Sequence, residues 1–259
     1  MHKEIILLFD SKNDTEESSK YCELIGQDAL WNNLTELLNA GISERLLLNL
    51  IKNPQNNQII VQVAKELEKI DKLNILSNLV LSDESVTKDP TLLSLKLKIL
   101  TEKDEDLFLN LISKAGASHI ESVLKYCEAK NPKLAIKHYL SIKNASEISR
   151  LAFKLEDWDT LSLFLIKYKN VSAWTSALEN ESSQKLFANV LENSDKFQDT
   201  ESASSLIKAL VSKNDSEALL KIMKSWLENN KVLSSSRSLQ TLYLIQLIKV
   251  NAKGFDFLF

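Results

Sequence analysis

Apolar residues recur every three or four positions along most of this chain, which is the spacing of one buried helical face. The clearest run is Ile59–Ile70, where six apolar side chains share one face and Gln62, Lys65 and Glu66 lie on the other. The pattern predicts a row of short helices over 29–38, 46–51, 59–70, 73–81, 92–100, 107–112, 120–127, 134–142, 146–155, 158–168, 171–178, 186–191, 203–211, 218–227 and 239–250.

Capping residues separate these runs. Asp89-Pro90 and Asn131-Pro132 each place an N-cap before a proline at the first helical position, and Ser118 with Glu121 has the spacing of a capping box. Further N-caps are expected at Ser43, Asp71, Asp104, Ser146 and Asp157. Since links of two to five residues force antiparallel neighbours, we expect helix pairs of about 30 residues.

Such pairs predict an all-α fold, a right-handed α-α superhelix or solenoid of the tetratricopeptide-like kind. No Gly-, Ser- or Pro-rich linker interrupts it, so residues 1–259 are expected to form one continuous segment. A helical pattern starting almost at residue 1 and the apolar end Gly254–Phe259 predict a piece of a longer chain. Leu239–Val250 is apolar on most sides and should be covered on all of them.

Composition narrows the function classes. Only 4 Gly and 3 Pro argue against Gly-rich phosphate loops and β-sandwiches. A net charge of −3 provides no basic excess for nucleic acid. Cys22 and Cys127 are far apart and indicate reduced thiols, and no apolar run is long enough to span or insert into a membrane.

Candidate chemistry is sparse. His119 and Cys127 lie eight positions apart, which fits neither a zinc site nor a metal-binding helix, and His2 and His138 have no matching partner. Acidic clusters such as Asp104–Asp106 stand at helix starts, where the dipole favours them. We therefore expect no catalytic, cofactor-binding or metal-binding residues, no small-molecule ligand, and a core role for the tryptophans, Trp31, Trp158, Trp174 and Trp226.

The run Lys125–Ala135, with sequence KYCEAKNPKLA, resembles the clathrin heavy chain family, which has KYCE, two variable residues, Asp-Pro, one variable residue and Leu-Ala. Asn131 replaces the family's aspartate, and Tyr139 and Trp174 fall at a family tyrosine and tryptophan. The resemblance continues in order at Asp71–Leu73, Ala218–Ile222, Ser236–Leu242 and Ile248-Lys249.

The resemblance implies a segment of the distal leg, toward the knee, of a vesicle coat protein. Its partners would be other clathrin heavy chains through lateral leg contacts, with the light chain and adaptors bound outside this segment. It would act in vesicle-mediated transport and endocytosis, in the cytoplasm on the cytosolic face of coated pits and vesicles. Two alternatives stay open: a helical-repeat subunit of a vacuolar protein sorting or tethering complex, and an enzyme with an unrecognised site in a helical superhelix.

Overall fold

The computed structural model describes residues 2–12, 14–25, 34–44, 47, 57–81, 89–115 and 117–255. Every regular element in these residues is helical, and none of them forms a strand. The chain divides into two compact units, Met1–Ala135 (unit 1) and Ile136–Phe259 (unit 2). The predicted all-α class is confirmed, whereas the handedness of a superhelix stays a prediction.

Unit 1 contains helices of 5 to 14 residues. They are α1 (His2–Ser11), α2 (Thr15–Ile25), α4 (Leu34–Asn39), α6 (Asn57–Lys69), the 3₁₀ turn η1 (Leu73–Leu76), α7 (Ser77–Leu81), α8 (Pro90–Lys103), α9 (Glu105–Ile112) and α10 (Ala117–Lys130). Helix α11 (Pro132–Ser141) begins in unit 1 and ends in unit 2.

Unit 2 continues the same design. It contains α12 (Ala145–Leu155), α13 (Trp158–Tyr168), α14 (Val171–Leu178), α15 (Ser183–Glu192), the 3₁₀ turn η3 (Ser194–Lys196), α16 (Thr200–Ser212), α17 (Ser216–Asn229), α18 (Lys231–Ser234) and α19 (Arg237–Phe255).

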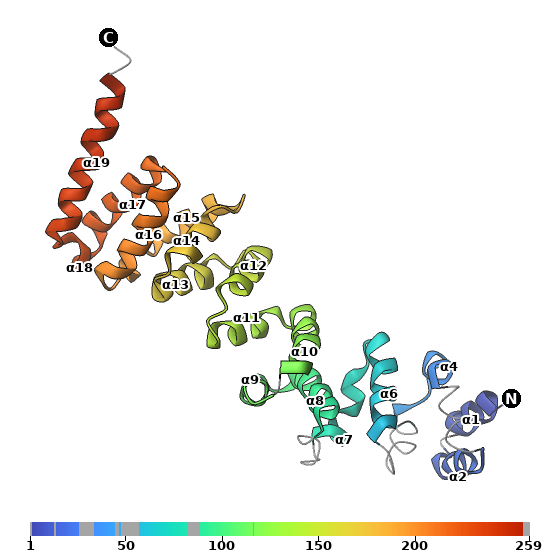
Figure 1. The fold of residues 1–259 in the computed structure, drawn as a ribbon. Helices are drawn as coiled ribbons and strands as arrows, with labels where there is room; N and C mark the ends of the chain where they lie inside the picture. Colours follow the sequence, from blue (N-terminus) through green and yellow to red (C-terminus); the bar gives the residue numbers. More distant parts are fainter. Residues whose placement is uncertain are drawn as a thin grey trace. The chain divides into compact units, whose positions relative to one another are not determined.

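Within each unit a helix packs on its near neighbours in the chain (Figure 1). Helix α8 contacts α6, α7, α9 and α10, and α16 contacts α13, α14 and α17. Helices next to each other and next but one in the chain therefore make most of the contacts. This nearest-neighbour pattern is that of a helical-repeat solenoid.

Both units bury an apolar core. In unit 1 it runs from Ile6 through Leu37, Val63 and Leu76 to Ile99. In unit 2 Trp174 and Trp226 are fully buried, which confirms the core role predicted for them, while Trp158 is half-buried. Trp31 lies outside the described residues.

Four predicted N-caps are confirmed by side-chain hydrogen bonds. Oδ1 of Asp89 accepts from the backbone N–H of Thr91 at 2.8 Å, and Asp104, Asn131 and Asp157 cap in the same way. The pairing of an acceptor side chain with the first free N–H groups is local, which is why sequence alone predicts it.

Two other predicted caps are wrong. Asp71 does not cap the following turn; it ends α6 in the left-handed region at φ 58° and forms an ion pair with Lys130. The cap of α12 is Asn144, not Ser146, because Oδ1 of Asn144 accepts from the N–H of Glu147 at 3.4 Å. The side chain of Ser118, the whole segment 29–33 and all of the predicted helix 46–51 except residue 47 lie outside the described part of the chain.

Several tight turns between helices use a left-handed residue that is not glycine. Lys143, Glu156 and Asn214 stand in the left-handed region at φ 54° to 56°, one or two residues after the ends of α11, α12 and α16. At Glu156 the N–H of Asp157 returns to the carbonyl of Ala152 at 2.9 Å, as in a Schellman motif. Asp157 then caps α13, so one left-handed residue and one cap make the whole turn.

Candidate interaction surfaces

The described cysteine has no reactive character. Cys127 is fully buried in α10, and its Sγ lies 3.6 Å from the carbonyl oxygen of Asn131. Burial raises the pKa of the Cys127 thiol to about 12, so the thiolate needed for nucleophilic attack does not form near neutral pH. It acts as a small apolar core residue.

The histidines are equally poor candidates for chemistry. Burial lowers the pKa of His138, whose ring lies 5.8 Å from the ring of Tyr139, and the residue is therefore neutral at pH 7. Nδ1 of His2 lies 2.9 Å from the hydroxyl of Tyr21. The side chains of His119 and Cys22 lie outside the described ones. Among those that are described, no three His, Cys, Asp or Glu residues gather as metal ligands.

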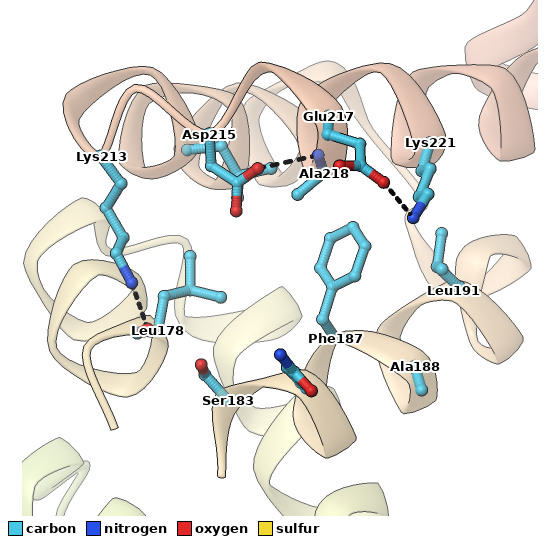
Figure 2. A pocket seen from close by; sticks show the side chains of 12 residues that line it. Leu178, Ser183, Phe187, Ala188, Leu191, Lys213, Asp215, Glu217, Ala218 and Lys221 are labelled. Carbon is cyan, nitrogen blue, oxygen red and sulfur yellow. Dashed lines mark hydrogen bonds and ion pairs between the residues drawn. The ribbon is translucent and has the colours of Figure 1, made fainter. Parts of the chain in front are cut away.

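A pocket of about 400 Å³ lies in unit 2 between α15 and the α16–α17 turn (Figure 2). Phe187 projects into this pocket, and the charged residues that line the pocket already have hydrogen-bond or ion-pair partners. Lys213 binds the carbonyl of Leu178, and Lys221 pairs with Glu217 at 2.7 Å. The fourth charged residue of the lining, Asp215, accepts from the N–H of Ala218, so each charged side chain of the pocket has a partner within the protein.

Buried polar contacts link one helix pair to the next. The side-chain amide of Asn230, 3% exposed, donates to the carbonyls of Ser194 and Phe197, both at 2.8 Å. Its Oδ1 accepts from the N–H groups of Val232 at 3.0 Å and Leu233 at 2.9 Å. All four hydrogen bonds available to this amide are therefore made inside the protein.

Polar contacts that are partly buried or exposed also join successive helix pairs elsewhere along the chain. The amide of Asn131 donates to the carbonyl of Thr101, Nδ2 of Asn189 donates to Asp159, and Lys98 pairs with Glu68. In each of these contacts the partners lie 30 residues apart, and in the Asn230 contacts 33 and 36. This separation matches the predicted helix pair of about 30 residues.

Most of the exposed surface is a mixture of opposite charges. Lys125 pairs with Glu121 and hydrogen bonding to it lowers the pKa of Glu121, while Lys169 bridges Asp199 at 2.7 Å and Glu201 at 3.1 Å. Hydrogen bonding from Lys169 also lowers the pKa of Asp199. Exposed pairs of this kind contribute little each, so such a surface favours weak association.

Helix α19 departs from that pattern. Leu239 is buried within unit 2, where α19 contacts α17 and α18, but Leu244, Ile245 and Ile248 are 58%, 43% and 68% exposed. The expectation that Leu239–Val250 is covered on all sides is therefore wrong for this chain. The sequence pattern predicts apolar residues on two faces of this helix, and only one of these faces packs against α17 and α18.

These features are those of a helical-repeat protein in which each helix packs on its near neighbours along the chain. No helix in the described residues is long and apolar enough to cross a bilayer.

Comparison with known proteins shows similarity to clathrin heavy chains. The chain is 24% identical over 222 residues to "Probable clathrin heavy chain 1" of Caenorhabditis elegans and 23% identical over 222 residues to "Clathrin heavy chain 2" of Homo sapiens. Each match covers 83% of this chain but 13% of the relative, so the chain spans about an eighth of their length. No protein-family model and no solved structure matches it.

Proposed function

We propose that this chain is a structural leg segment of a clathrin-type vesicle coat. The observation that carries the proposal is the collinear similarity to two clathrin heavy chains over 83% of the chain. The helical-repeat fold supports it, because each helix packs on its near neighbours and polar contacts join successive pairs.

The proposed mechanism is lateral packing of segments from different molecules into the edges of a cage. A surface of exposed, alternating charges makes each contact weak and reversible, and many such contacts acting together make the assembly stable. No catalytic step, metal, cofactor or small-molecule ligand enters the mechanism. The partners are other heavy chains, with light chain and adaptors binding outside this segment, on the cytosolic face of coated pits and vesicles.

The natural protein tests this proposal. An affinity tag placed on it in its own cells should bring it into the coated-vesicle fraction of a density gradient, and immuno-electron microscopy should label polyhedral coats. Purification as a stoichiometric member of a tether, with no labelled coats, would favour the vacuolar sorting or tethering alternative. A purified protein that forms neither coat nor complex would leave the proposal without support.

A further inference from the structure

The pocket between α15 and α17 lies where the regular stacking of unit 2 is interrupted. Helices next but one in the chain pack directly on each other in the pairs α13–α15, α14–α16 and α17–α19. Between α15 and α17 the turn η3 intervenes and contacts both helices, and Phe197 after it packs its ring 4.8 Å from that of Trp226, near the end of α17. Alongside the first half of α17 the space stays open as the pocket of about 400 Å³. Since α13 and α19 pack on its two walls, the pocket lies within the row of helices and not at its end.

The lining of this pocket is apolar where it is most buried. Leu178 and Leu210 are 5% and 1% exposed, and Phe187, Leu191 and Ala218 are half-buried. Figure 2 shows the ring of Phe187 projecting into the space below α17. A cavity of this size and lining favours a bulky apolar group, which gains free energy by leaving water.

The charged residues at the pocket are negative in sum. Two lysines and two carboxylates in the lining cancel one another: Lys213, Lys221, Asp215 and Glu217. The turn between α14 and α15, whose ends at 178 and 183 both line the pocket, adds Glu179 and Glu181. Both are exposed, and within the described residues neither forms an ion pair, whereas Lys185 on α15 pairs with Glu156 at 2.7 Å. Four carboxylates against two lysines leave a net charge of −2 around an apolar cavity.

We propose that this pocket binds a short peptide segment of a partner protein, in which one bulky apolar residue is flanked by lysines or arginines. The apolar side chain enters the cavity beside Phe187, and the flanking cations lie against Glu179 and Glu181. Charge complementarity then selects a basic segment over an acidic one. The inference adds a partner to the proposed coat segment, and its test involves no coat assembly, so its failure would leave the coat proposal standing.

A peptide-binding experiment tests the proposal on the whole chain. The probes are labelled synthetic peptides of about seven residues, roughly 23 Å when extended, with a central leucine or tryptophan flanked by lysines, by serines or by glutamates. Fluorescence anisotropy should show about tenfold tighter binding of the lysine peptides than of the glutamate peptides, and raised salt should shrink that preference. A lysine peptide with a central serine should bind about tenfold more weakly than its leucine counterpart, because it has no group to fill the cavity.

Matched variants place the peptide in this pocket. Ala188→Trp puts a large ring at an exposed lining position and should abolish binding, whereas Val211→Trp, at a 51% exposed position of α16 outside the lining, should not. Glu179→Lys with Glu181→Lys should reverse the preference for lysine peptides. The same change of charge at Glu201 and Glu228, exposed residues on α16 and α17 outside the lining, should preserve it. Circular dichroism checks that each variant is folded.

Several outcomes would overturn the proposal. No binding of any lysine peptide, or equal affinity for lysine and glutamate peptides, would remove the basic partner. Binding that needs no central apolar residue would reduce the effect to attraction between a cationic peptide and an acidic protein. Binding that survives Ala188→Trp would place the peptide elsewhere on the chain. Sedimentation showing a dimer that Ala188→Trp dissociates would make a second copy of this chain the occupant.

Discussion

Asn230 is expected to hold the end of unit 2 together. Asn230→Ala removes two donors to the carbonyls of Ser194 and Phe197 and the cap on Val232 and Leu233. Loss of a cap costs about 1 kcal/mol, and a buried polar group left without a partner costs about 1–3 kcal/mol. Because these groups belong to one hydrogen-bond network, their separate costs do not add fully, and we expect the free energy of unfolding to fall by about 3–4 kcal/mol.

Urea denaturation followed by circular dichroism and tryptophan fluorescence measures this loss, because the buried ring of Trp226 packs on Phe197, whose carbonyl accepts from the Asn230 amide. The matched control is Asn229→Ala at the neighbouring position, whose exposed side chain makes a 3.5 Å hydrogen bond to Ser225. It should cost less than about 0.5 kcal/mol. Equal losses for the two variants, or a loss below about 1 kcal/mol for Asn230→Ala, would refute the network.

Asn230→Asp adds a pH test. An aspartate here keeps the cap but faces two carbonyl oxygens, so only its protonated form can donate to them. Its folded-state pKa should therefore rise above the unfolded value of about 3.9. The variant is then closest to wild type below that value and loses stability as pH rises through its folded pKa. A variant whose deficit relative to wild type is the same at pH 4 and pH 7 would contradict this account.

Three further expectations concern single positions. Lys143→Gly should stabilise the protein by up to about 1 kcal/mol, because glycine adopts the left-handed backbone conformation without the steric cost that lysine has there. Lys154→Gly inside α12 should destabilise the protein by about 1 kcal/mol, and thermal melts that rank the two variants otherwise would contradict the turn geometry. Cys127 should resist alkylation at pH 8 until urea unfolds unit 1, and labelling of native protein at the rate of a free thiol would contradict its burial. Burial lowers the pKa of His138, so the stability that the neutral ring contributes is present above pH about 6.5 and declines as the pH falls below that value. His138→Phe should flatten this decline, and an unchanged pH profile of stability would assign the decline to other groups.

Much of the fold could be predicted from the sequence because helix formation and capping depend on residues that are close together in the chain. The period of apolar residues predicted the helices, and Asp89, Asp104, Asn131 and Asp157 were identifiable as caps because a cap bonds only to N–H groups two or three residues away. The left-handed turns at Lys143 and Glu156 were not, since lysine and glutamate have no preference for positive φ. There the packing of the two flanking helices decides the backbone.

Longer-range features were decided by tertiary structure alone. Nothing near Asn230 in the sequence indicates that its amide meets carbonyls 33 and 36 residues earlier, because that contact exists only once successive helix pairs are packed. The same holds for α19. Its pattern of apolar residues showed two apolar faces, but which of them α17 and α18 cover follows from how the helices pack. Periodicity reports that a face is apolar, and only packing determines what the face meets.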